Sequence, residues 1–430
     1  MGRLTILKAG CLWLPLLSAS PALAADTVNP GSVAWVLTAS ALVLFMTLPG
    51  LALFYGGLVQ SKNVLSVLMH CFAITCVASL IWTVCGYSLA FDGAGPWLGG
   101  LGKLFLAHLD PLRAGTELPE AAFALFQMTF AVITPALMIG AFPERVRFSF
   151  VLAFSALWLI LVYLPVAHWM WGGGWLAALG AQDFAGGVVV HTTAGVSALV
   201  AALAVGRRRG FPNHLELPHS PGMTMAGAGM LWVGWFGFNG GSALTADAAA
   251  ASAILATHLA ACAAALAWIA VERVRIGKPT SVGIVTGCVA GLATVTPAAG
   301  FVGPMGGAML GVLGGVVCFF AVLFIKQRLQ IDDTLDVFAV HGVGGMLGSV
   351  LLAVFASPVW GGAGLPNGMD AARQFGIQVL AVAVTAVWSG LVTVALVRVL
   401  RALTGLRVDG EAEYEGLDLA AHGERAYEFR

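Results

Sequence analysis

The sequence is short of charge. Only 10% of its 430 residues are Asp, Glu, Lys or Arg, whereas charged residues make up about 25% of an ordinary soluble domain. The formal net charge is +0, so the composition offers no basic surface and no nucleic-acid partner is predicted. A chain that is 59% hydrophobic and so poor in charge is not expected to fold as a soluble domain.

Cysteine patterns typical of a metal site or a disulfide framework are also lacking. The sequence holds 7 Cys, none of them in a C-x-x-C pair, and Cys11 belongs to the N-terminal segment considered below. The other six stand in apolar stretches, where free Cys behaves as a small hydrophobic residue: Cys71, Cys76, Cys85, Cys262, Cys288 and Cys318. We therefore predict neither a metal nor another cofactor.

What the sequence has instead is a succession of long apolar runs. They match the ~20 residues that cross the hydrocarbon core of a bilayer as a helix, and they lack the short alternating segments of a transmembrane barrel. We predict an all-α polytopic membrane protein with eleven transmembrane helices in residues 26–402 and a charged tail at 403–430. The expected spans are 31–59, 64–90, 119–142, 149–169, 184–206, 221–239, 248–272, 280–297, 304–326, 335–356 and 372–402.

The first 25 residues are predicted to be a cleaved secretory signal peptide. Arg3 and Lys8 precede a short apolar core, CLWLPLLSASP, and Ala22-Leu23-Ala24 forms an A-x-A cleavage site. The alternative is a short additional transmembrane helix, which the two prolines of this segment disfavour. Cleavage would place the mature N-terminus, near Asp26, outside a bacterial inner membrane.

Lys and Arg gather on one side of the expected bundle. From an outer N-terminus, eleven crossings leave the C-terminus inside, and the expected inner segments include Arg145 and Arg207 to Arg209. The expected outer segments contain only Lys103, Arg113 and Arg373. This bias follows the positive-inside rule, so we predict a periplasmic N-terminus and a cytoplasmic C-terminus.

Two segments of the chain resemble each other. When DFAGGVVVHTTAGVSALV (183–200) is laid over DTLDVFAVHGVGGMLGSV (333–350), Asp, His and Gly residues coincide, including His191 with His341. The segments open the fifth and tenth expected spans, which are five positions apart in the order of spans, so the two segments cross the membrane in opposite directions. This predicts that spans one to five and six to ten form an inverted repeat around a central pore, with an eleventh helix outside it.

The two equivalent histidines are the first candidates for function. Ionisable side chains within a membrane span are costly and by default indicate function. Pseudo-symmetry would bring His191 and His341 face to face near the midplane, where two neutral imidazoles can share one proton between nitrogens. The alternatives are two histidines that only join helices by hydrogen bonds, and two metal ligands, although no Cys is placed to complete a metal site.

Acidic residues stand close to both histidines in sequence. Asp183 opens the fifth span, where a carboxylate can cap a helix and attract cations. Asp336 lies five residues before His341, and Asp332 and Asp333 are expected in the preceding loop. For Asp183 the alternatives are pure capping and direct contact with the substrate, and capping is also the simple interpretation of the other three.

Aromatic residues form a second candidate set. Phe126 and Phe130 are four residues apart and so share one helix face, while Trp171, Trp235 and Phe238 approach the outer ends of other spans. Each alone is typical of a core or of an interfacial belt. Together their faces would suit a small cation.

At these motifs the chain resembles a bacterial ammonium transporter of the Amt/Mep/Rh superfamily, specifically of the Amt branch. The resemblance extends from about residue 30 to the C-terminus. Its motifs are ALFYGGLVQSKN (52–63), FQMTFAVITPALMIGAFPERVRF (126–148), AHWMWGGGWL (167–176), DFAGGVVVH (183–191), WVGWFGFNGGSA (232–243) and DDTLDVFAVHGVGG (332–345).

The resemblance implies a role for each candidate residue. His191 and His341 would form the pore and proton relay, and Asp183 and Asp336 would act structurally or electrostatically. An outer ammonium site would consist of Phe126, Phe130, Trp171 and Ser242, a phenylalanine gate of Phe130 and Phe238, and the pore lining of Phe54, Tyr55 and Trp235. It also implies a homotrimer with one pore per subunit, and a tail that docks a PII-type signal protein through the stretch that contains Tyr414, Gly416, Leu417, Asp418, His422 and Tyr427.

The mechanism depends on the cost of desolvating an ion. Moving an intact ammonium ion through an apolar pore costs tens of kcal/mol in the Born limit, and each cation–π contact returns about 2 kcal/mol. Ammonium should therefore lose its proton at the pore mouth and cross as ammonia, with associated proton transfer making transport electrogenic. The alternatives are a neutral channel for ammonia or carbon dioxide and an ammonium sensor; an enzyme is not expected, because no nucleophile or metal set accompanies the histidines.

Overall fold

The computed structural model describes residues 27–428 except 94, 214–216 and 366–368. The predicted signal peptide, residues 1–25, lies outside the described residues. Throughout the described part, the regular secondary structure is helical, and the only strand-like pairing is an isolated bridge between Val146 and Arg407. The predicted all-α architecture is thereby confirmed.

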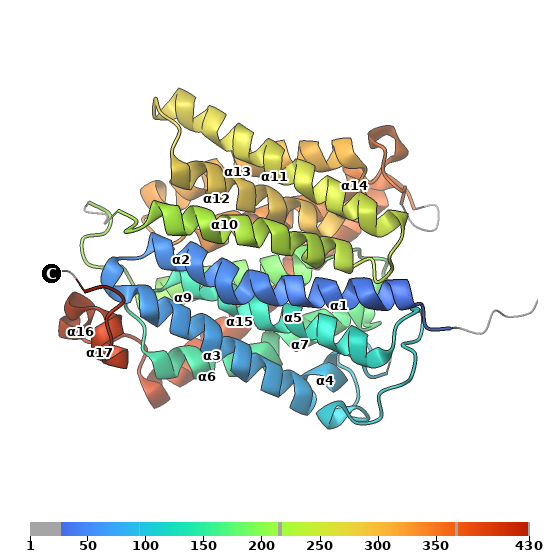
Figure 1. Ribbon diagram of the computed structural model, residues 1–430, viewed down its shortest axis with the longest axis horizontal. Coiled ribbons are helices and arrows are strands. Elements are labelled where there is room, and N and C mark those ends of the chain that lie inside the picture. Colours follow the sequence, from blue (N-terminus) through green and yellow to red (C-terminus); the bar gives the residue numbers. More distant parts are fainter. Residues whose placement is uncertain (1–26, 94, 214–216, 366–368, 429–430) are drawn as a thin grey trace, which may run out of the picture.

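The helices lie roughly side by side along one axis (Figure 1). The α-helices are α1 (Pro30–Phe45), α2 (Ala52–Leu58), α3 (Val64–Ile81), α4 (Tyr87–Phe91), α5 (Glu120–Met138), α6 (Phe148–Trp158), α7 (Leu164–Trp171), α8 (Trp175–Ala178), α9 (Thr193–Val205), α10 (Pro221–Trp235), α11 (Ala248–Arg275), α12 (Ser281–Val295), α13 (Pro304–Leu323), α14 (Val343–Phe355), α15 (Ala371–Thr404), α16 (Gly410–Glu415) and α17 (Leu417–His422).

Short π-helical turns continue or interrupt most of the long helices. They are η1 (Met46–Leu51), η3 (Trp82–Gly86), η6 (Leu159–Tyr163), η7 (Gly187–Thr192), η8 (Phe236–Gly240), η10 (Phe324–Arg328) and η11 (Phe338–Gly342). Such turns are rare in proteins overall, and those that occur are often found at functional sites. His191 lies in η7 and His341 in η11, so both sequence-predicted histidines occupy this conformation.

Ten helical stretches of the described residues are long and apolar enough to cross a bilayer. They are Pro30–Leu58, Ser61–Phe91, Glu120–Ala141, Phe148–Ala178, Gly187–Val205, Ala248–Arg275, Ser281–Ala298, Pro304–Arg328, Phe338–Phe355 and Ala371–Thr404. The predicted sixth span coincides with α10 and η8, which run together from Pro221 to Gly240 but are not among these ten. The count of eleven therefore stays a prediction.

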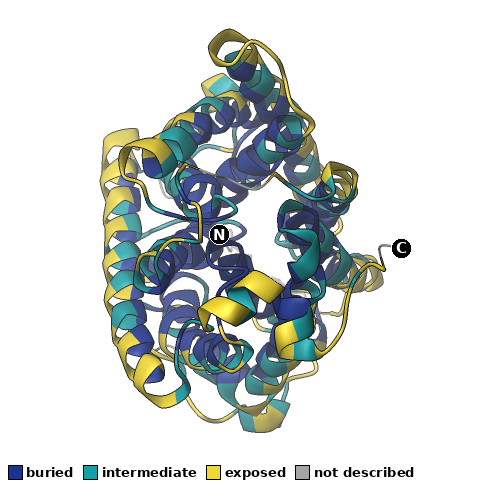
Figure 2. Ribbon diagram, turned by 90° about the vertical axis from the view of Figure 1, so that its left-hand side faces the viewer, coloured by how far each residue is buried: buried dark blue, intermediate teal, exposed yellow. Residues whose placement is uncertain are grey.

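The bundle has two distinct ends. The C-terminal tail and the connections at 59–63, 143–147 and 329–336 share one end, which we call the tail face; the end where α1 begins is the loop face (Figure 1). Figure 2 looks along the helices and shows buried residues facing the interior and exposed residues around the perimeter. Large hydrophobic side chains such as Leu80, Leu266 and Leu391 are exposed on these helices, as expected of helices that face lipid.

Small residues allow the helices to approach closely. Gly195 of α9 faces the backbone of Gly342 in η11, and a Cβ atom there would lie 2.3 Å from the Gly342 Cα. Gly345 of α14 faces η7 in the same way, with a Cβ position 2.5 Å from the Cβ of His191. These two glycines are equivalent in the aligned segments, so each histidine turn packs against a glycine of the other segment.

The tail is packed rather than extended into solvent. The backbone N–H of Leu417 donates to the Asn63 Oδ1 at 2.8 Å, and the Ser66 N–H donates to the Asp418 Oδ1 at 2.8 Å. Asp418 therefore caps the start of α3, and α17 lies against that helix. A disordered, solvated tail, which the composition alone allowed, is not what the structure contains.

Candidate functional site

The two histidines meet in the centre of the bundle. The Nδ1 atoms of His191 and His341 are 3.3 Å apart, and their ring centroids are 5.2 Å apart with an interplanar angle of 20°. Both side chains are buried, with exposed fractions of 1% and 3%. Because a neutral imidazole has one donor and one acceptor nitrogen, one ring carries its proton on Nδ1 and the other accepts through Nδ1.

The π-helical turns direct the two rings toward each other. Each turn widens the helix by one residue, and the glycines that face the turns remove the side chains that would keep the two segments apart. The Nε2 of His191 is buried and has no hydrogen-bond partner among the described residues. An unpartnered buried nitrogen of this kind is available to a small polar molecule beside the pair.

Aromatic rings continue from His191 toward the loop face. The His191 ring stacks on Trp235 with 5.6 Å between centroids and faces Phe238 at 6.2 Å. Phe238 and Phe130 are 4.3 Å apart, and Phe130 meets Trp171 edge to face at 5.7 Å. The structure thus brings together the predicted gate phenylalanines and places them between the histidine pair and the loop face.

A cavity of about 290 Å³ opens beyond Phe130 on the loop face. Phe130, Trp171 and Ser242 of the predicted outer site line it. The Ser242 hydroxyl donates to the Phe238 carbonyl at 2.8 Å, which leaves the lone pairs of its oxygen free to accept. Phe126 is fully buried one layer behind, packed edge to face against Phe130 at 5.0 Å, and is not among the lining residues.

Six further residues of this cavity were not among the predicted site residues. Its lining also includes Phe91, Phe123, Gln127, Met170, Phe184 and Leu244. The spacing of Phe123, Gln127 and Phe130 on α5 follows the i, i+4, i+7 pattern of one helix face, so two of the missed residues carried a readable signal. Phe91 ends α4, and only the tertiary packing brings it to this place.

Asp183 holds the start of η7. Its Oδ1 accepts from the backbone N–H groups of Gly186 and Gly187 at 2.8 and 2.6 Å, and its Oδ2 accepts from those of Val188 and Val189 at 2.8 and 2.9 Å. The capping predicted for Asp183 is therefore present, and each of its two carboxylate oxygens accepts two backbone N–H bonds. The Asp183 carbonyl also accepts from Trp171 Nε1 at 2.7 Å, which links this cap to the outer cavity.

On the tail face, the corresponding cap is Asp333 rather than Asp336. Asp333 accepts from the Val337 N–H at 3.1 Å and from the Phe338 N–H at 2.7 Å, at the start of η11. The capping expected for the Asp336 side chain is thus corrected, because Asp336 pairs instead with Lys326 at 2.8 Å. The alignment of Asp183 with Asp333 was the signal for this role.

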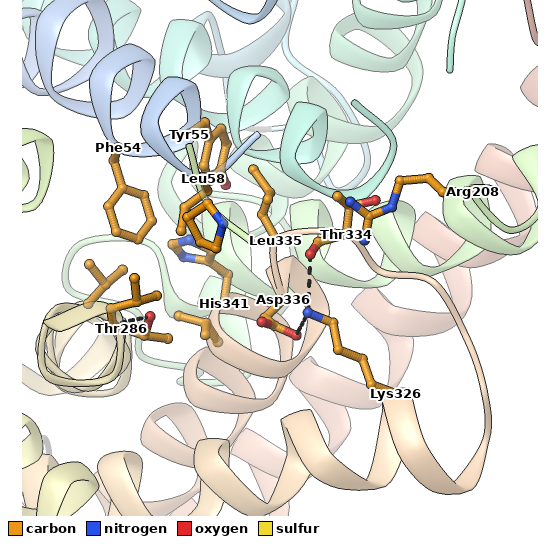
Figure 3. Close-up of a pocket in the computed structure, with 14 residues that line it drawn as sticks. Phe54, Tyr55, Leu58, Arg208, Thr286, Lys326, Thr334, Leu335, Asp336 and His341 are labelled. Carbon is orange, nitrogen blue, oxygen red and sulfur yellow. Dashed lines mark hydrogen bonds and ion pairs between the residues drawn. The ribbon is translucent and has the colours of Figure 1, made fainter. Parts of the chain in front are cut away.

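A second cavity, of about 180 Å³, lies between the histidine pair and the tail face (Figure 3). His341 reaches into it from one side, and Phe54, Tyr55 and Asp336 also line it. The Tyr55 hydroxyl donates to the Leu137 carbonyl at 2.9 Å. The third predicted lining residue, Trp235, instead stacks on His191 and donates to the Thr296 hydroxyl at 2.9 Å.

Buried ion pairs surround the tail-face cavity. Arg208 pairs with Asp332 at 3.0 Å and with Glu144 at 3.1 Å, and Arg145, fully buried, donates to the Asp332 carbonyl at 2.9 Å. Burial raises the pKa of Asp332, but the charge and hydrogen bonds of Arg208 outweigh it and leave that pKa below its usual value. From the sequence, Arg145 and Arg208 indicated only which side of the membrane their segments face. The tertiary structure shows that they also hold this part of the protein together through ion pairs and hydrogen bonds.

The part of the chain that the structure describes contains no group of three or more His, Cys, Asp or Glu residues placed to hold a metal ion. The arrangement is instead a row of compartments: an aromatic cavity, two closely packed phenylalanines, a histidine pair, and a cavity with charged walls. Such a row can bind a small cation by its faces, exclude water at the phenylalanines and exchange a proton at the imidazoles.

Comparison with known proteins gives consistent results. The family model described as Ammonium Transporter Family matches residues 34–427. An ammonium transporter of Aquifex aeolicus is 46% identical over 93% of this chain and 94% of its own length, and the ammonium transporter Amt1 of Archaeoglobus fulgidus is 43% identical over 93% and 100%. Among solved structures, one described as a sensor Amt protein superposes with a TM-score of 0.86 and 31% identity, covering 91% of this chain and 98% of its own. The structure of Saccharomyces cerevisiae Mep2 superposes with a TM-score of 0.82 and 36% identity, covering 90% of this chain and 90% of its own.

Proposed function

The chain belongs to the ammonium transporter family, and from this premise we propose that it takes up ammonium by separating the ion into ammonia and a proton at the pore mouth, after which the ammonia passes along the histidine pair. Its relatives are transporters, so it is a multi-pass membrane transporter rather than an enzyme. The observation that carries the proposed mechanism is the 3.3 Å contact between the His191 and His341 Nδ1 atoms, buried between two cavities.

Ammonium binds first in the loop-face cavity. The rings of Phe130 and Trp171 offer their faces to a cation, and the Ser242 oxygen accepts one of its N–H bonds. Phe126 supports this site from behind by fixing the Phe130 ring. The aromatic faces select for charge and small size, and the serine selects for a hydrogen-bond donor.

The ion loses its proton at the gate. The rings of Phe130 and Phe238 are 4.3 Å apart and both are buried, so a hydrated ion cannot pass between them without losing its shell. Desolvation costs an ion tens of kcal/mol in the Born limit, whereas neutral ammonia escapes most of that cost. Deprotonation is therefore the lower-energy route, by the same physics that lowers the pKa of a buried Lys.

Ammonia then passes the histidines toward the tail face. Each imidazole can accept from and donate to a molecule that is itself a donor and acceptor. The bonded imidazole pair also provides a path for the released proton, which makes the net movement electrogenic. Phe54 and Tyr55 line the exit, and Asp183 and Asp333 hold the two turns in place.

The topology follows from the same premise. We take α10 with η8 as the sixth of eleven crossings, in addition to the ten helical stretches above. Spans one to five and six to ten then form inverted repeats around the pore, and α15 is the additional eleventh helix. The packing of Gly195 on η11 and Gly345 on η7 supports the repeat. The tail face is then cytoplasmic and the loop face periplasmic, in a bacterial inner membrane, with residues 1–25 a cleaved signal, 26–402 the transporter domain and 403–430 a regulatory tail.

The tail is proposed to be a docking site for a PII-type signal protein, and the protein to be a homotrimer with one pore in each subunit. Support for the docking site is the packed position of the tail, where Lys62 Nζ donates to the Tyr414 carbonyl at 2.5 Å and Asp418 caps α3. A sensing role through such a partner is the second candidate, because one structural relative is described as a sensor Amt protein.

Current recorded from proteoliposomes after an ammonium jump tests the proposal. A saturable inward current, absent from protein-free liposomes and altered in His191→Ala, is expected. Rapid internal alkalinisation without current would instead identify a neutral ammonia channel. Neither current nor alkalinisation, in vesicles shown to contain folded protein, would contradict transport and favour the sensing role.

A further inference from the structure

The tail-face cavity contains an ion pair that the mechanism above leaves unused. Lys326 Nζ lies 2.8 Å from the Asp336 Oδ1 and donates to the Thr334 carbonyl at 3.1 Å (Figure 3). Both charged side chains line the same cavity as His341. A small molecule that leaves the histidine pair toward the tail face therefore enters a space that holds a carboxylate and an amine.

The backbone at both residues departs from regular geometry. Asp336 has a φ of 62°, in the left-handed region that non-glycine residues seldom adopt. Lys326 lies in η10, a π-helical turn at the end of α13. Unfavourable backbone conformations persist where the surrounding structure requires them, and they gather at functional sites.

Each charged residue that lines this cavity is paired with a residue of opposite charge. Its charged lining residues are Arg208, Lys326 and Asp336. Arg208 is compensated from outside the lining by Asp332 and Glu144. Lys326 is the cation paired directly with Asp336, the carboxylate among these lining residues.

The Lys326 amine is also a chemical analogue of the transported ion. A Lys Nζ and an ammonium ion are compact nitrogen cations that donate several N–H bonds. The position now filled by Nζ, within hydrogen-bond distance of a carboxylate and a backbone carbonyl, is one that free ammonium would fill equally well.

We propose that Lys326 is a specificity-determining residue that occupies, as a tethered ammonium group, a cation site on the exit side of the pore. This inference rests on the proposed function. With the site filled, ammonia leaves a cavity that does not retain cations, and ammonium from the tail side finds no free carboxylate below the histidines. The ligand excluded is a monovalent cation with N–H donors.

The test removes the tethered cation and asks whether the free one binds. Lys326→Met keeps the length and apolar stem of the side chain but removes its charge. The double variant K326M/D336N removes the carboxylate as well, Lys326→Arg keeps the charge, and Arg328→Gln removes an exposed charge from the same π-helical turn. Thermal unfolding of the purified variants in detergent is measured against ammonium chloride, with choline chloride at equal ionic strength as the reference.

K326M is expected to gain an ammonium-dependent stabilisation whose half-effect concentration is at least about tenfold lower than in wild type, within the usual range for coupled sites. K326M/D336N, K326R and R328Q should respond as wild type does. An equal response of K326M and wild type, or a gain that persists in K326M/D336N, would overturn the inference. If K326M does not fold, Lys326→Gln, which retains a donor for the Thr334 carbonyl, takes its place in the same comparison.

A transport measurement separates this inference from the proposed function. In proteoliposomes loaded with ammonium, uptake by K326M should be inhibited at internal concentrations about tenfold lower than those that inhibit wild type. A wild type without any transport would refute the proposed function, while the binding comparison would still decide whether Lys326 fills a cation site.

Discussion

Replacing Asp183 with Asn is the most direct test of how the histidine turn is held. The carboxylate accepts four backbone N–H bonds, two on each oxygen, at 2.6–2.9 Å. Asn has one carbonyl oxygen and so keeps two of these bonds, while its amide NH₂ group faces two N–H donors that it cannot accept. The change is nearly isosteric, so the number of acceptors and the charge are what it alters.

The expected cost follows from that count. Each buried N–H left without an acceptor costs about 1–3 kcal/mol, so two of them cost about 2–6 kcal/mol. Loss of the negative charge at a helix start adds roughly 0.3–1 kcal/mol. D183N should therefore destabilise the protein by about 2–7 kcal/mol. Asp333→Asn, whose carboxylate accepts two backbone N–H bonds, leaves one donor unpaired and should cost about 1–3 kcal/mol.

The measurement is the thermal unfolding midpoint in detergent, with transport recorded on the same preparations. D183N should lower the midpoint by roughly 2–14 °C, since about 2–4 °C per kcal/mol holds for mid-sized domains and about half that slope applies to a chain of this length. D333N should lower it by less. A midpoint within about 1 °C of wild type for D183N, or a larger loss for D333N, would refute the reasoning from acceptor count.

Three further outcomes are expected. His191→Ala should change the rate or selectivity of transport while the protein stays folded, because the ring lies between the two cavities; wild-type kinetics would remove it from the pore mechanism. Deletion of residues 405–430 should abolish capture by an immobilised PII-type protein, and unchanged capture would contradict a docking site in the tail. Arg208→Gln leaves Asp332 and Glu144 without their buried partner and should destabilise the protein by about 3–5 kcal/mol, measured by thermal unfolding; an unchanged midpoint would show that Arg145 compensates them.

The histidine pair shows how far local sequence reaches. Alignment of two short segments identified His191 and His341 as equivalent, and it also aligned Asp183 with Asp333. The resemblance nevertheless implied a role for Asp336, which stands nearer than Asp333 to His341 in sequence. Asp336 has a left-handed backbone and its carboxylate pairs with Lys326, and sequence proximity carries no information about either.

The outer cavity shows a similar division. Helical spacing placed Phe126 and Phe130 on one face of α5, and the family resemblance implied their place at the outer site. Phe126 shares that helix but lies a layer deeper, whereas Phe91 reaches the cavity from α4. Which aromatic ring reaches a cavity depends on how neighbouring helices pack, and that is a property of contacts between segments distant in sequence.

By itself the sequence determined that this is a helical membrane protein with two equivalent histidines, because apolar length, charge and repeats are local properties of the chain. The tertiary structure alone decided the 3.3 Å contact between their nitrogens and the pairing of Lys326 with Asp336. Each of these depends on π-helical turns and close helix packing, where a small shift of the backbone changes which side-chain atoms come into contact.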